Sequence, residues 1–175
     1  MNRTRRAVMA TAVIALGAVS CGAGDTSAAV PPRPEGTGPL ARDVVRTDLD
    51  TSAAAAGAPE NDPDWLSMSE KASPDSAKSC AVAFKGFGTE AAPVDLDHFE
   101  ATVRELRKRD WKQAGKPEQR KNKRGEVFNS RVLLDQRGWR IVAEYMDAPM
   151  GGTLGLMAFD NACMKAHGSE PDPVG

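Results

Sequence analysis

Acidic and histidine side chains that stand close together are the first candidates for chemistry in this sequence. The chain has two histidines, and His98 stands among Asp95, Asp97 and Glu100. A closed zinc site needs four well-placed nitrogen or sulfur ligands, and a calcium loop needs alternating acids around a central glycine. The sequence has neither pattern here. Acids at this spacing are typical of a first helical turn, where they offset the helix dipole. We therefore predict no metal site.

Nucleophile and phosphate-binding motifs give a similar result. No serine lies in a GxSxG sequence, and His98 and His167 stand in surface-type contexts rather than beside a nucleophile. The glycines at 86, 88 and 151–155 do not open a helix whose N–H groups could hold a phosphate, so we interpret them as turns. The sequence therefore predicts no catalytic residue and no cofactor. The alternative is a small secreted hydrolase or ligand carrier whose site residues are dispersed in the sequence.

The first cysteine, Cys21, comes after two segments of different character. Residues 1–6 contain three arginines, and residues 7–19 carry no charge and are rich in alanine, valine, isoleucine and leucine. A helix of thirteen residues would be about 20 Å long, too short for a hydrocarbon core of roughly 30 Å. The pattern therefore indicates a signal peptide over residues 1–20 rather than a membrane span.

The residues directly before Cys21 indicate the type of signal peptide. Ala18-Val19-Ser20-Cys21 resembles the lipobox of bacterial lipoproteins, although that family most often has leucine in place of Ala18. The resemblance implies that Cys21 carries fatty acyl chains such as palmitate. It also implies an extracytoplasmic protein, anchored to the outer face of the cell membrane. Residues 4–9 resemble a twin-arginine signal, so either export route is open. The alternative is an ordinary signal peptide with Cys21 incidental.

The two remaining cysteines, Cys80 and Cys163, form an even pair. In an oxidising compartment we expect them to form a disulfide bond. The alternative is two reduced cysteines that are buried as small apolar residues. On the chain-entropy model, closing this separation of 83 residues would stabilise the fold by about 4–5 kcal/mol, less any strain.

Composition divides the rest of the chain. Residues 22–63 contain nine alanines, six prolines, five glycines and no aromatic residue. Such a segment buries too little apolar surface to offset its chain entropy, so we predict a lipid-anchored disordered linker over residues 21–63. Every aromatic residue lies between Trp65 and Phe159. We therefore predict one globular domain over residues 64–168 and a disordered tail over residues 169–175.

Periodicity predicts the elements of that domain. Leu96, Phe99, Val103 and Leu106 form a helical stripe over residues 97–111, capped by Asp97 with Glu100 or by Asp95. Strands are expected over residues 81–84, 126–134, 139–145 and 153–159, and Phe128, Val132 and Leu134 should share one face of theirs. The order β-α-β-β-β indicates an α+β fold with one helix packed on a mostly antiparallel sheet.

Several motifs within the predicted domain together resemble a known group of proteins. Leu106 and Trp111, Val132-Leu133-Leu134 before Gly138-Trp139, and Gly152-Thr153-Leu154 before a final cysteine resemble small actinobacterial secreted lipoproteins of unknown function. The resemblance covers roughly residues 80–163. Its motifs are packing motifs, so it implies a fold and a location but no activity.

Charge is distributed unevenly along the chain. Residues 104–124 hold ten basic and three acidic residues, a net charge of +7, whereas the rest of the chain after the signal peptide carries −11. We expect residues 112–125 to form a loop or hairpin arm. We predict that an anionic polymer or lipid headgroups would contact its five cations, which are Lys116, Arg120, Lys121, Lys123 and Arg124. The alternative is a solvated loop without a partner.

Together these patterns predict a cell-surface lipoprotein with a small non-catalytic binding or interaction domain. Its partners would be the membrane, through the lipid anchor, and an anionic polymer, lipid headgroups or an unidentified protein. Nucleic acid is not expected outside the cell, and the basic segment lacks aromatic residues on which bases could stack.

Overall fold

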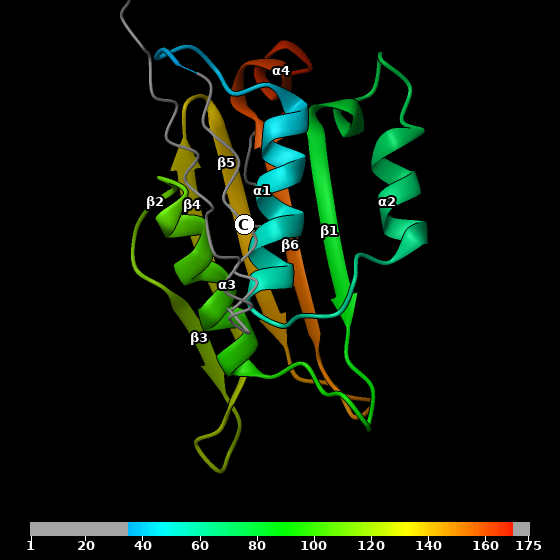
Figure 1. Cartoon of the computed structure of the whole chain (residues 1–175), viewed down its shortest axis with the longest axis vertical. Coiled ribbons are helices and arrows are strands. Elements are labelled where there is room, and N and C mark those ends of the chain that lie inside the picture. Colours follow the sequence, from blue (N-terminus) through cyan, green and yellow to red (C-terminus); the bar gives the residue numbers. More distant parts are fainter. Residues whose placement is uncertain (1–34, 170–175) are drawn as a thin grey trace, which may run out of the picture.

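The structure is a computed structural model that describes residues 35–169 of the chain (Figure 1). The predicted signal peptide, Cys21 and residues 170–175 of the predicted tail lie outside the described residues. The described residues form an α+β fold, as the sequence predicted. A six-stranded antiparallel sheet has the strand order β1-β6-β5-β4-β2, and β3 pairs with the same strand as β2, namely β4.

The main strands follow the predicted order. The strands are β1 (Ala81–Phe87), β2 (Lys112–Gln113), β3 (Glu118–Lys121), β4 (Val127–Gln136), β5 (Trp139–Met146) and β6 (Thr153–Asp160). The helices are α1 (Arg42–Ala55), α2 (Pro63–Glu70), α3 (Leu96–Lys108) and α4 (Asn161–Ala166), and a 3₁₀ turn η1 (Ala77–Cys80) precedes β1. The predicted β-α-β-β-β order corresponds to β1, α3, β4, β5 and β6.

The core lies between the sheet and the helices α1 and α3, which cover the same sheet face (Figure 1). Alternate strand residues point to this face and are fully buried, among them Leu134, Ile141 and Leu156. Phe99 and Leu106 of α3 pack on them, as the helical stripe predicted. The cap of α3 is Asp95, the second of the two predicted caps, and the helix ends at Lys108 rather than at Trp111.

The predicted linker over residues 21–63 is wrong for its second half, because α1 is part of the core. Its residues at positions 45, 48, 49, 52 and 53 form a buried stripe with helical spacing. Val45 and Leu49 are fully buried, and each contributes about 1.5–3 kcal/mol to folding. The globular domain therefore begins near Leu40, not at residue 64, and two helices rather than one pack on the sheet.

The first helix also closes one edge of the sheet. Arg42 donates hydrogen bonds to the carbonyl oxygens of Ser79 and Ala81, each at 2.6 Å, and Arg46 donates to that of Ala83. The Asn61 side chain accepts from the N–H of Lys85 at 2.9 Å. The outward backbone groups of β1 are therefore satisfied from within the chain, which prevents edge-to-edge association at this strand.

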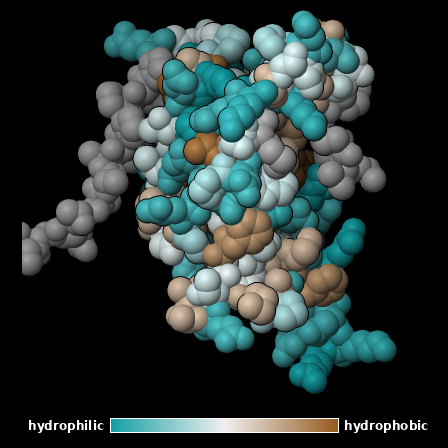
Figure 2. All heavy atoms as spheres, turned by 90° about the vertical axis from the view of Figure 1, so that its right-hand side faces the viewer, coloured by the Kyte–Doolittle hydropathy of each residue, from teal (hydrophilic) through white to brown (hydrophobic). Residues whose placement is uncertain are grey.

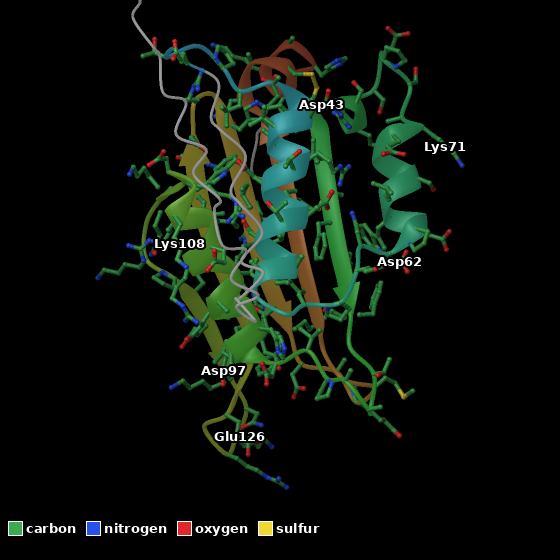
Figure 3. The ribbon with its side chains drawn as sticks, viewed as in Figure 1. Asp43, Asp62, Lys71, Asp97, Lys108 and Glu126 are labelled. Carbon is green, nitrogen blue, oxygen red and sulfur yellow. A yellow bond between two sulfur atoms is a disulfide. The ribbon has the colours of Figure 1, made fainter. Side chains whose placement is uncertain are left out.

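The predicted disulfide between Cys80 and Cys163 is confirmed, with a Cα–Cα distance of 5.5 Å. Cys80 precedes β1 directly, and Cys163 lies in α4, directly after β6. Because β1 and β6 are paired along their whole length, the bond joins the two ends of the chain segment that makes the sheet. It lies at the upper end of the molecule beside α4 (Figure 3).

The position of α1 gives a prediction that separates the two domain boundaries. A fragment over residues 36–169 should unfold cooperatively, whereas one over residues 64–169 should not fold, because half of the core face would be exposed to water. Within the longer fragment, Leu49→Ala should lower the free energy of unfolding by about 2–5 kcal/mol. Urea denaturation followed by circular dichroism measures both. A cooperative transition in the shorter fragment would contradict the assignment of α1 to the core.

Candidate functional site

The second face of the sheet has no helix packed across it in the described structure. Directly paired residues form a row across five strands on this open face: Glu118, Arg131, Glu144, Gly155 and Lys85. On the same face, Val142 and Met157 form an adjacent apolar pair. The open face therefore combines a charged row with apolar side chains next to it.

A hollow of about 760 Å³ lies over the middle of this face. Its floor includes Val142, Gly155 and Met157, and its walls are Trp65 of α2 on one side and the β3–β4 hairpin on the other. The volume is within the range of about 300–1,000 Å³ that is usual for small-molecule sites. Two of the side chains that line it are more exposed than is usual for large apolar residues, at 48% for Met146 and 36% for Met157.

Gly155 leaves a gap in the centre of the hollow. It lies in the middle of β6, between its paired neighbours Lys85 and Glu144. A Cβ atom at this position would come no closer than 3.9 Å to another atom, so packing does not require a glycine there. The sequence predicted both a turn at glycines 151–155 and a strand over residues 153–159, and Gly155 belongs to the strand. A lone glycine inside a strand was the available signal, because such a residue weakens a strand unless something approaches it closely.

Trp65 borders the hollow through its contact with Lys85. The Lys85 ammonium lies 4.6 Å from the centre of the Trp65 ring and 5.6 Å from that of Phe87, within the range of a cation–π interaction. Asp62 caps α2 by accepting from the N–H groups of Asp64 and Trp65, which fixes the start of the helix that carries the indole. The rim on the β1 side is therefore aromatic and positively charged.

Phe128 does not share the buried face with Val132 and Leu134, contrary to the prediction. The register between β3 and β4 shifts beside it, since Arg120 pairs with Asn129 and Lys121 with Val127. An extra residue on one strand changes the alternation of side chains at that point. Phe128 is 38% exposed and lines the hollow on the hairpin side.

The five predicted cationic contacts lie together on an exposed hairpin, residues 116–126, which we call the basic hairpin. Lys116, Arg120, Lys121, Lys123 and Arg124 are all exposed. Its turn is ordered by Asn122, whose side chain accepts from the N–H groups of Arg124 and Glu126 at 2.9 and 3.0 Å. Of the two predicted forms, loop and hairpin arm, the structure has the hairpin arm. It projects from the lower end of the molecule, where Glu126 is labelled (Figure 3).

One residue of the basic segment is not at the surface. The Arg109 side chain is 1% exposed, lies 4.0 Å from the Asp48 carboxylate and donates to the Glu105 carbonyl oxygen at 3.1 Å. It belongs to the core contact between α1 and α3. The other basic residues of α3, Arg104, Arg107 and Lys108, are exposed. Lys108 is paired with Glu105 at 2.6 Å.

Figure 2 shows the side of the molecule formed by β1 and α2. Brown and tan residues gather over its lower half, and teal residues form the lowest projection. Apolar and charged surfaces thus adjoin near the end of the sheet that carries the basic hairpin.

Of the four residues considered as metal ligands, Asp95 and His98 form the N-terminal cap of α3. The Asp95 carboxylate accepts from the His98 N–H at 3.0 Å and lies 2.6 Å from the His98 Nδ1 atom. Within residues 35–169, the one cluster with metal-ligand spacing is Cys80, Cys163 and His167, and both of its sulfur atoms are in the disulfide.

Comparison of the chain with protein-family models found no match, and comparisons with curated proteins and with solved structures found none either. In the part of the chain that the structure describes, no helix is both long enough and apolar enough to cross a bilayer.

The Asp95 cap gives a pH-dependent prediction. The hydrogen bond from the His98 N–H lowers the pKa of Asp95 below its ordinary value. A lowered pKa stabilises the fold above the unfolded-state pKa near 4, and this contribution is lost as the pH falls through the folded-state pKa. Asp95→Ala should therefore cost about 1 kcal/mol at pH 7 and less at pH 3. Urea denaturation at both pH values measures this cost, with Asp97→Ala as the control. If Asp97→Ala lowered the free energy of unfolding more than Asp95→Ala does, Asp95 would not be the cap.

Proposed function

We propose that this chain is an exported lipoprotein, held at the outer face of the cell membrane through acylated Cys21, whose domain is a non-catalytic binding module for anionic components of the cell envelope. The observation that carries the binding proposal is the basic hairpin. Five exposed cations lie on β3, directly before it and in the turn after it, with only Glu118 and Glu126 as acids between residues 116 and 126. Neither the core nor the disulfide uses these side chains.

The placement of the hairpin also supports binding to something away from the anchor. The chain enters the fold at Leu40, whose backbone bonds to Arg137 and Trp139 at the turn between β4 and β5. Asp43, near this end, and Glu126, in the hairpin, are labelled at opposite ends of the molecule (Figure 3). A domain held from the Leu40 end would present its basic hairpin outward, toward an anionic polymer of the envelope.

The hairpin gives the first test. Changing Lys116, Arg120, Lys121, Lys123 and Arg124 to glutamine should remove most binding to polyphosphate, because each near-surface cation contributes about 1 kcal/mol. Wild-type binding should weaken as salt rises, since the Debye length is about 8 Å at physiological ionic strength. Titration calorimetry at low and high salt measures the affinity.

A matched control removes charge elsewhere on the same domain. Glutamine at Arg104, Arg107 and Lys108 lowers the net charge but leaves the hairpin intact, and it should retain most of the polyphosphate binding. Because the control removes three charges and the hairpin variant five, an equal loss of binding free energy per charge removed would show that overall charge rather than the hairpin determines binding. The absence of wild-type binding at low salt would contradict the proposal.

The anchor gives the second test. Cys21→Ser should release the protein into the medium or leave uncleaved precursor, because the acyl chains supply the membrane attachment. Fractionation of cells after a high-salt wash, followed by mass spectrometry of the N-terminal peptide, measures the outcome. Retention of Cys21→Ser in the washed membrane fraction as a processed chain would contradict the lipoprotein assignment.

A further inference from the structure

The central glycine of β6 is the starting point, because nothing inside the fold requires it. A glycine in a strand interior costs stability through its chain entropy and its missing side chain. Such glycines mark a bulge, a bend, or a close approach by a ligand or another backbone. At Gly155 the register on both sides is regular, and a Cβ atom would meet no neighbour within 3.9 Å. Of these reasons, an approach from outside the chain is left, by a ligand or by the backbone of a second copy, and the surroundings of Gly155 favour the ligand.

The surroundings of Gly155 define the chemistry of such a ligand. The hollow has an apolar floor at Val142 and Met157 and an aromatic wall at Trp65. Methionine side chains adapt to ligands of different shape, because they are unbranched and polarisable. In the charged row, Arg131 pairs across the strands with Glu118 on one side and Glu144 on the other, so both acids face a cation. A flexible apolar chain fits this floor better than a rigid polar molecule does.

Charge complementarity fixes the other end of the ligand. Arg120 lies at the hairpin wall of the hollow, next to Phe128. Beyond it the basic hairpin continues with Lys121, Lys123 and Arg124, all exposed. The hollow itself is lined by equal numbers of cations and acids, with Asp147 bonded to Phe128, so the net positive charge at this end comes from the adjoining basic hairpin and favours an anionic group over a cationic one.

We propose that the hollow over Gly155 binds a single-chain anionic amphiphile of the fatty-acid type, with its apolar chain on Val142, Gly155 and Met157 and its anionic group at Arg120. This proposal shares the basic hairpin with the proposed function but adds an apolar site that a polyanion does not need. The hollow spans five strands, which is roughly 19 Å at the usual strand spacing of about 4.8 Å, and this length suits an extended chain.

The test compares ligands that differ in one part, with a soluble form of the chain that begins at Gly22 and therefore lacks the acylated Cys21. Dodecanoate, titrated below its micelle concentration, should bind, and methyl shifts of Met146 and Met157 should report the contact by NMR. Dodecyltrimethylammonium has the same chain and the opposite charge, and should bind at least about tenfold more weakly. Absence of dodecanoate binding, or equal affinity for the two amphiphiles, would overturn the proposal.

The variants fill the hollow without disturbing the strand. Gly155→Val places a side chain of high strand preference into the gap, so the melting temperature should stay the same or rise. It should weaken dodecanoate binding by about tenfold or more, because it displaces apolar contacts of the chain. Gly155→Ala should have a smaller effect in the same direction. Thr153→Val, two residues away on the same strand face, is the control and should bind as the wild type does.

Two further measurements distinguish this proposal from the proposed function and from dimer formation on the open face. Polyphosphate has no apolar chain, so its binding tests the basic hairpin alone. If the proposed function is wrong, polyphosphate does not bind. If the present proposal is wrong, dodecanoate does not bind. Gly155→Val should leave the polyphosphate affinity unchanged. Sedimentation tests for a second copy on the open face. A dimer that Gly155→Val abolishes would overturn the amphiphile as the occupant.

Discussion

The buried carboxylate of Asp48 joins the two helices on which the rest of the structure depends. Its Oδ2 atom accepts a hydrogen bond from the Trp111 indole at 2.9 Å, and its Oδ1 atom lies 4.0 Å from the Arg109 guanidinium. All three side chains are almost fully buried. A buried carboxylate is tolerated only where cations and donors surround it, so α1 has one position in which Asp48 is satisfied. That position covers the half of the sheet that α3 leaves exposed.

The same placement of α1 determines which surfaces remain available. With Asp48 held against Arg109 and Trp111, the opposite side of α1 presents Arg42 and Arg46 to the carbonyl groups of β1. One face of the sheet and one edge are thereby closed. The open face and the hairpin at the other edge are left for contacts outside the domain, and the hollow and the cations both lie there.

Sequence patterns predicted most of the sheet, because β4, β5 and β6 alternate clearly and turns such as Arg137-Gly138 separate them. The first helix was missed for a physical reason. Two of its five buried positions are Asp48 and Ser52, and Ala41 at its start has no capping side chain, so neither the apolar stripe nor a helix start was visible. The hollow could not be predicted either. A strand that contains Gly155 was predicted, but the hollow also depends on the bulge that changes the side of Phe128 and on the contact of Trp65 with Lys85, and neither follows from a local sequence pattern.

The bonding of Leu40 to the turn between β4 and β5 has a mechanical consequence. Arg137 donates to the Gly38 carbonyl, and the Trp139 indole donates to that of Leu40. A pulling force between the point where the chain enters and the tip of the hairpin would therefore pass from this turn directly along β4. The covalent backbone of β4 would carry such a force along its length, so the load would fall first on the hydrogen bonds that hold Gly38 and Leu40 to the turn. Helix α1 begins at Arg42, directly after this attachment, so these few hydrogen bonds would shield its packing on the core from a pull on the tether until they break.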